Sequence, residues 1–169
     1  MLHKVMNADE PDSRRGDLES LISADLREIS IESDQIGRLF ASTHNLRPND
    51  FRALLYIMVA ESAGRPMTSG DLSQVMGMSG SAITYLVDRL IDSGHLRRDS
   101  HPGDRRKVVL RHGESGTATA RSYFRPLTTH TRVALSDLPD ADLVAAHRVL
   151  TALLSAMGRF QGELGGHGG

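Results

Sequence analysis

The segment 67–112 constrains the fold of this 169-residue chain more than any other, because it encodes two short helices and then a hairpin. Thr68 and Asp71 have the spacing of a capping box, which opens a short helix that Gly77 can end. Ser79 can then cap a second short helix. Two short helices joined by a tight turn that contains glycine predict a helix-turn-helix motif.

A β-hairpin is predicted directly behind the second helix. Gly94 stands where a left-handed residue ends a helix, and strand-like runs follow at 95–100 and 107–112. The run Pro102-Gly-Asp-Arg-Arg between them is a turn signal. A hairpin in this position is a wing, so residues 48–115 are expected to form a winged helix-turn-helix lobe.

Long amphipathic helices are predicted on both sides of this lobe, which makes the expected fold mainly α with a small β-hairpin wing. The last of them carries an apolar seam with alternating spacings of three and four residues, at Leu143, Ala146, Leu150, Leu153, Met157 and Phe160. A single copy of the chain cannot easily cover such a seam. Residues 17–47 and 116–161 are therefore expected to form a helical dimerisation region.

Both ends of the chain are expected to be disordered. Residues 1–16 are polar and show no period, and residues 162–169 hold five glycines in eight positions.

Between them, no run approaches the roughly 20 consecutive apolar residues that a membrane span needs. No secretion signal is present either, so a cytoplasmic protein is expected.

The charge of the chain is segregated. The formal net charge of −1 would by itself oppose a polyanionic partner. Residues 1–34, however, hold four basic and nine acidic residues, a balance of −5, whereas residues 79–112 hold seven basic and four acidic residues, a balance of +3. The near-zero total thus hides a basic segment that coincides with the second short helix and the hairpin.

This basic segment is a candidate DNA-binding surface. The start of the second short helix exposes small or hydrogen-bonding residues and no acidic one before Asp88, and a helix N-terminus attracts phosphate. Three cations crowd the hairpin tip, where they can contact a phosphate or the minor groove. Two alternatives remain: the residues at the start of the helix only cap it, and the hairpin tip is only a solvated turn. The expected DNA contacts are Thr68, Ser79, Gly80, Ser81, Thr84, Tyr85, Arg89, Asp104, Arg105, Arg106 and Lys107.

Residues 17–162 resemble the multiple-antibiotic-resistance-regulator (MarR-type) family of winged-helix transcriptional regulators. The resemblance rests on the helix-turn-helix, on the run Val87-Asp-Arg-Leu-Ile-Asp-Ser-Gly-His-Leu, and on Asp104-Arg105-Arg106 followed by Lys107-Val-Val-Leu. It implies that Arg106 contacts a minor groove or a phosphate and that Asp104 braces it. Tyr85 departs from the family, which often has arginine there, so a common contact is missing.

The resemblance also implies a homodimeric regulator, a repressor, that binds a pseudo-palindromic double-stranded DNA site. It further implies release by a small aromatic or anionic ligand, for which Phe40, His44, Arg52 and Tyr56 are candidate contacts. Core packing explains Phe40 and Tyr56 equally well. A dimeric winged-helix module that binds protein instead of DNA is the alternative.

No chemistry beyond binding is expected from this sequence. It has no cysteine, no nucleophile elbow, no phosphate-binding glycine loop and no His-Glu-x-x-His motif, so we expect neither an enzyme nor a cofactor. Eight histidines raise the alternative of a metal sensor. The histidine pairs of this chain lack the i, i+4 ligand spacing, however, so no metal site is expected.

Overall fold

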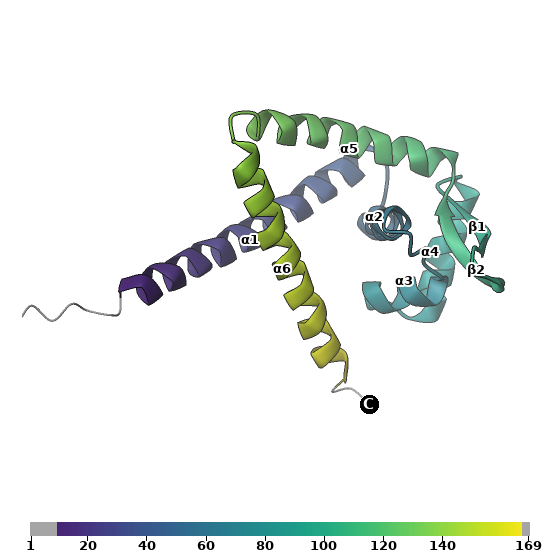
Figure 1. Cartoon of the computed structure of the whole chain (residues 1–169). Coiled ribbons are helices and arrows are strands. Elements are labelled where there is room, and N and C mark those ends of the chain that lie inside the picture. The colour runs from purple at the N-terminus through teal and green to yellow at the C-terminus, as the bar shows by residue number, and fades with distance from the viewer. Residues whose placement is uncertain (1–9, 167–169) are drawn as a thin grey trace, which may run out of the picture. The chain divides into compact units, whose positions relative to one another are not determined.

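The computed structural model describes residues 10–166, and it confirms a mainly helical fold with one hairpin (Figure 1). The elements, in chain order, are α1 (Glu10–Thr43), α2 (Pro48–Ser62), α3 (Ser69–Met76), α4 (Gly80–Asp92), β1 (Leu96–His101), β2 (Asp104–His112), α5 (Glu114–Ala134) and α6 (Asp140–Gly166). The chain forms two compact units, one up to Tyr123 and one from Phe124. None of the described helices is long and apolar enough to cross a membrane.

The predicted caps of the helix-turn-helix are confirmed. The Thr68 hydroxyl accepts the backbone N–H of Asp71, and the Asp71 carboxylate accepts the backbone N–H of Thr68 at 2.8 Å, so the capping box is complete. Gly77 ends α3 in the left-handed conformation, at φ +63°. The Ser79 hydroxyl accepts the backbone N–H of Ala82 and caps α4.

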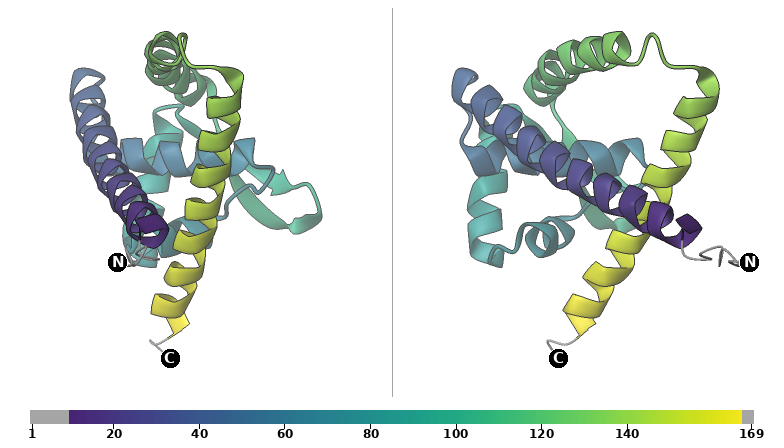
Figure 2. Two further views of the ribbon diagram at one scale, coloured as in Figure 1. Left: turned by 60° about the vertical axis from the view of Figure 1, so that its left-hand side comes forward. Right: turned by 90° about the vertical axis from the view of Figure 1, so that its left-hand side faces the viewer.

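The wing is a two-stranded antiparallel sheet, whose register pairs Leu96 with His112 at one end and His101 with Asp104 at the other. The turn is shorter than predicted, because β2 begins at Asp104 and leaves only Pro102 and Gly103 between the strands. An irregularity between Ser100 and His101 allows this pairing to continue to the tip. The hairpin projects beyond the helices of its lobe (Figure 2, left).

The core of the lobe joins three helices to both strands. Its fully buried members come from α2, α3, α4, β1 and β2, and they are Ala53, Leu54, Ile57, Leu72, Ile83, Leu86, Val87, Leu90, Leu96 and Leu110. A smaller aromatic cluster joins α1, α2 and the middle of α5. There, the ring centroids of Phe40, Phe51 and Tyr123 lie 5.0 to 5.1 Å apart.

The sequence analysis assigned too many residues to the two disordered ends, 1–16 and 162–169. Helix α1 already begins at Glu10, with Pro11 in the first turn, where a missing N–H breaks no intrahelical hydrogen bond. Helix α6 runs on through the glycines to Gly166, because adding residues to a formed helix is easier than nucleating one. The remaining residues of the two predicted tails, 1–9 and 167–169, lie outside the described residues.

Candidate nucleic-acid interface

Helix α4 buries one face and exposes the other. Ile83, Leu86, Val87 and Leu90 point into the core of the lobe, which forces the residues between them outward. Gly80, Ser81, Thr84 and Tyr85 are accordingly exposed, and the Tyr85 side chain is the most prominent of them, at 65% exposure. The predicted uncharged surface therefore exists as one face of one helix.

Hydrogen bonds within α4 decide what this face offers to a ligand. The Thr84 hydroxyl donates to the Gly80 carbonyl at 2.9 Å, and the hydroxyls of Ser79 and Ser81 lie 3.2 Å apart. Because the proton of Thr84 is already used, its side chain presents oxygen lone pairs and a methyl group. Thr68, another expected contact, spends its hydroxyl on Asp71 at 2.8 Å and lies half-buried at the start of α3.

The structure places Arg89 differently from the sequence prediction, since its guanidinium binds inside the lobe. Its Nε donates to Asp50 Oδ2 at 3.1 Å, and its Nη2 pairs with Asp50 Oδ1. Asp50 is only 5% exposed and lies in the first turn of α2. This hydrogen bond and charge pairing raise the pKa of Arg89. The guanidinium also lies over the Tyr85 ring, 5.1 Å from its centroid, so it supports Tyr85 from behind.

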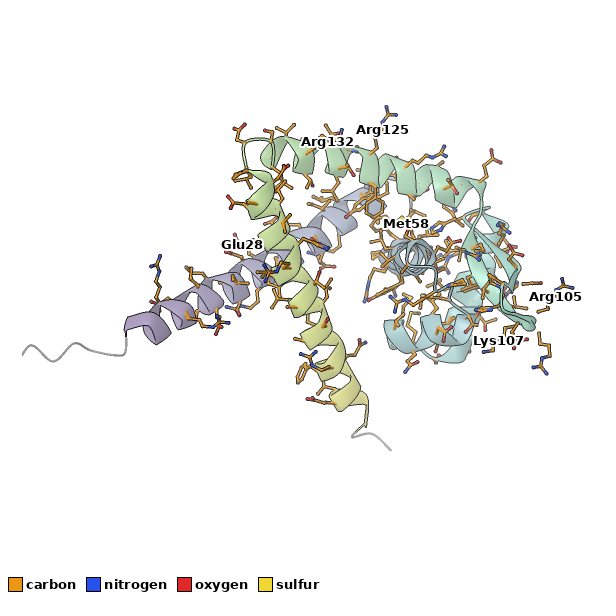
Figure 3. The ribbon with its side chains drawn as sticks, viewed as in Figure 1. Glu28, Met58, Arg105, Lys107, Arg125 and Arg132 are labelled. Atoms are coloured by element: carbon orange, nitrogen blue, oxygen red, sulfur yellow. The ribbon has the colours of Figure 1, made fainter. Side chains whose placement is uncertain are left out.

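The wing tip carries three consecutive exposed cations, Arg105, Arg106 and Lys107. Arg105 and Lys107 lie on the hairpin (Figure 3), and neither has an ion pair with any described residue. Arg106 is 92% exposed, and its Nε lies 3.4 Å from Asp104 Oδ1, which also accepts the Arg106 backbone N–H at 3.1 Å. Asp104 is thus positioned to brace the tip, as the resemblance implied.

The other basic side chains of the segment 79–112 are neutralised within the lobe. Arg97 pairs with Asp99 and Arg98 pairs with Asp88, each at 2.7 Å, and Arg111 binds Glu61 at 3.0 Å. The excess positive charge counted in the sequence is therefore concentrated on the three consecutive tip residues. Sequence counting alone does not reveal this, because two of these pairs, Arg98–Asp88 and Arg111–Glu61, join different elements.

A half-buried polar cluster fixes the base of the wing to α2. Glu61 accepts hydrogen bonds from Arg111 and from His112 Nδ1, the latter at 2.7 Å. Burial by itself would raise the pKa of Glu61, but the hydrogen bonds from His112 and Arg111 outweigh it and hold that pKa below the ordinary value of 4.5. The wing is thereby held against a helix that is distant in the sequence.

The four candidate ligand contacts do not surround one cavity. Phe40 belongs to the aromatic cluster and stacks on His44, with ring centroids 3.8 Å apart. Arg52 and Tyr56 instead line a cavity of about 360 Å³ between α1 and α2, together with Ser33, Asp34, Leu55 and Val59. The structure therefore supports core packing for Phe40 and leaves Arg52 and Tyr56 at an accessible site.

Comparison with known proteins identifies the family. The model of the MarR family matches residues 44–107, which span α2 to the wing tip. A transcriptional regulator of the helix-turn-helix type from Bacillus subtilis, YcgE, is 31% identical over 117 residues, which are 69% of this chain and 73% of YcgE. The chain belongs to the MarR family of winged-helix transcriptional regulators.

Solved structures agree with this assignment. A MarR family protein from Bacillus stearothermophilus is 26% identical, covers 91% of this chain and 99% of its own, and superposes with a TM-score of 0.62. The MepR–DNA complex from Staphylococcus aureus is 17% identical, covers 80% of this chain and 95% of its own, and has a TM-score of 0.54. At 17% identity, this similarity shows only that MepR and this chain have the same fold.

Proposed function

We propose that this MarR-family chain is a sequence-specific double-stranded DNA-binding regulator, a repressor that acts as a homodimer on a pseudo-palindromic operator. One observation carries the proposal: three consecutive exposed cations, Arg105, Arg106 and Lys107, lie at the wing tip, while the exposed start of α4 is free of acidic side chains. A DNA duplex needs this combination, with cations for its backbone and small polar groups for its base edges.

The proposal assigns different tasks to the two parts of the lobe. Gly80, Ser81, Thr84 and Tyr85 enter the major groove, and the tip residues Arg105, Arg106 and Lys107 contact phosphates or the minor groove. Ser79 and Thr68 serve mainly as helix caps, and Arg89 positions Tyr85. The determined structure of MepR with DNA supports this use of the fold.

Apolar surface that one copy leaves uncovered supports the homodimer. Large apolar side chains on α1 and α6 are exposed, including Leu21, Leu39, Leu154 and Phe160. Two-fold symmetry then places the half-sites about one helical turn, roughly 10 bp, apart. Release from DNA would follow when a small aromatic or anionic ligand at Arg52 and Tyr56 stabilises another spacing of the two lobes.

Selection of bound sequences from a random DNA pool tests the function. We expect a palindromic motif, with affinity that falls steeply with salt because several phosphates are neutralised. Arg106→Ala should weaken binding to every sequence about tenfold, and Thr84→Ala should change the preferred bases. If Arg106→Ala leaves the affinity unchanged at low salt, or if no motif emerges, the chain is better described as a protein-binding winged-helix module.

A further inference from the structure

Helix α1 presents an apolar seam that its own chain leaves uncovered, and two carboxylates lie within this seam. Asp25 and Glu32 are exposed and stand three or four residues from the nearest apolar members, so helical geometry places them on the same face. The apolar members are all at least 41% exposed, and they are Leu18, Leu21, Ile29, Ile36 and Leu39. Any partner that covers this seam therefore also covers two carboxylates.

These two carboxylates have no cation beside them within the chain. Neither Asp25 nor Glu32 makes an ion pair with any described residue, whereas Asp34, on the opposite face of α1, pairs with Arg38. Burial of a carboxylate without a cation is strongly unfavourable, because the group loses its hydration and gains nothing in return. A purely apolar partner therefore does not fit this face. The partner has to bring two cations with the same separation.

Helix α5 carries two cations with that separation. Asp25 and Glu32 are seven residues apart, which is nearly two turns and about 10 Å along a helix. Among the described helices, only α5 has two arginines seven residues apart, Arg125 and Arg132 (Figure 3). Both arginines are exposed, and within residues 10–166 neither of them has an ion pair. The two helices are therefore complementary in the spacing of their charges.

The net charges of the helices agree with this match. Helix α1 holds eight acidic and four basic residues, whereas α5 holds one acidic and three basic residues. Helix α6 holds three acidic and two basic residues, so neither α6 nor a second α1 attracts the carboxylates of the seam. Arginine also suits an apolar face, because its methylene stem packs against apolar side chains while its guanidinium binds the carboxylate. Helix α5 of a second copy is therefore the occupant that fits.

We propose that Asp25 and Glu32 of one copy pair with Arg125 and Arg132 of a second copy, and that these pairs select a copy of this chain as the partner of α1. Each pair occurs twice in a two-fold symmetric dimer, because each copy supplies one α1 and one α5. The apolar seam supplies most of the affinity, and the charge pairs supply the register and the choice of partner. The pairing rests on the homodimer of the proposed function and adds the contacts that recognise the partner.

Charge reversal in two separate chains tests these pairs by sedimentation equilibrium. One full-length chain carries Asp25→Arg with Glu32→Arg, and the other carries Arg125→Glu with Arg132→Glu. Either chain alone brings like charges together, so its dimer dissociation constant should rise at least about tenfold. An equimolar mixture of the two chains should dimerise with nearly the native constant, because both contacts of the mixed dimer join opposite charges again. Thermal melting of each variant verifies that it is folded.

Arg148→Glu with Arg159→Glu is the matched control, since it changes the net charge equally at exposed arginines of α6 and should leave the dimer intact. An equal loss of dimer in this control would overturn the pairing, because net charge alone would then explain the effect. Reversed chains that dimerise like the native chain, or folded reversed chains whose mixture stays monomeric, would overturn it as well. A native chain that is monomeric at every accessible concentration would instead overturn the homodimer of the proposed function, and the pairs with it.

Discussion

At the scale of single residues, one ion pair decides how α4 is presented. Asp50 and Arg89 are 39 positions apart in the sequence, yet two hydrogen bonds join them across the lobe. The pair is asymmetric, because the Asp50 side chain is almost fully buried, whereas that of Arg89 retains 26% exposure. Its disruption leaves a partly desolvated charge without a partner, which costs more than the loss of a surface pair.

We therefore expect Asp50→Asn to lower the free energy of unfolding by about 2 kcal/mol, as measured by urea denaturation. The matched control is Asp34→Asn, which removes the exposed i, i+4 pair with Arg38 and should cost no more than about 0.5 kcal/mol. Equal losses for the two variants would mean that the Asp50–Arg89 pair contributes no more than a surface contact. In DNA selection, Asp50→Asn should also relax base preference, because Tyr85 loses its support.

The acid sensitivity of the lobe should depend on Glu61. The pKa of this carboxylate lies below its ordinary value in the folded chain, so its contribution to stability is complete above about pH 4.5 and is lost as the pH falls through the folded-state pKa. Between pH 5 and about pH 3, the native chain should lose more stability than Glu61→Gln does. Urea midpoints along this series measure the difference, and parallel curves would show that Glu61 is not responsible.

At the scale of elements, the entry into α5 is tied to the end of α4. The backbone N–H of Gly113 donates to the His95 carbonyl at 2.9 Å, and that of Ser115 donates to the Gly94 carbonyl at 3.2 Å. Gly116 lies so close to His95 that a Cβ atom there would overlap the carbonyl oxygen. The return of the wing into α5 thus requires residues without side chains, and the start of α5 is fixed to the winged lobe.

Gly116→Ala should accordingly destabilise the chain by about 3 kcal/mol, because the obstacle is backbone and cannot rotate away. Gly70→Ala is the control, since a Cβ atom in the first turn of α3 meets only the Thr68 hydroxyl oxygen at an ordinary 3.6 Å. That variant should be neutral or more stable by up to about 1 kcal/mol. Thermal denaturation compares the two, and a neutral Gly116→Ala would refute the close packing at this junction.

At the scale of the whole molecule, the single chain does not bury its long helices. None of the described side chains of α6 is fully buried, and Leu150, Leu154, Met157 and Phe160 are all at least half exposed. Burial of such side chains contributes roughly 1.5 to 3 kcal/mol each. A second copy of the chain is the partner that the proposed function requires, and α6 is the element on which this requirement is tested most directly.

Leu154→Glu should shift sedimentation equilibrium from dimer toward monomer by more than about tenfold in dissociation constant. The Leu154 side chain is 69% exposed in one copy, so this change should hardly affect a chain that acts alone. Val108→Glu, at an exposed apolar site on the wing, is the control and should leave the association unchanged. Unaltered association of Leu154→Glu would exclude this face of α6 from the dimer.

The sequence by itself determined the local features of this protein. The capping box at Thr68, the left-handed Gly77, the Ser79 cap and the hairpin were all predicted, because each depends on residues a few positions apart. The tertiary structure decided which charges remain free. Arg89 was predicted to contact DNA, but its partner Asp50 is brought to it only by packing of α2 against α4, and no local pattern reports such a pair.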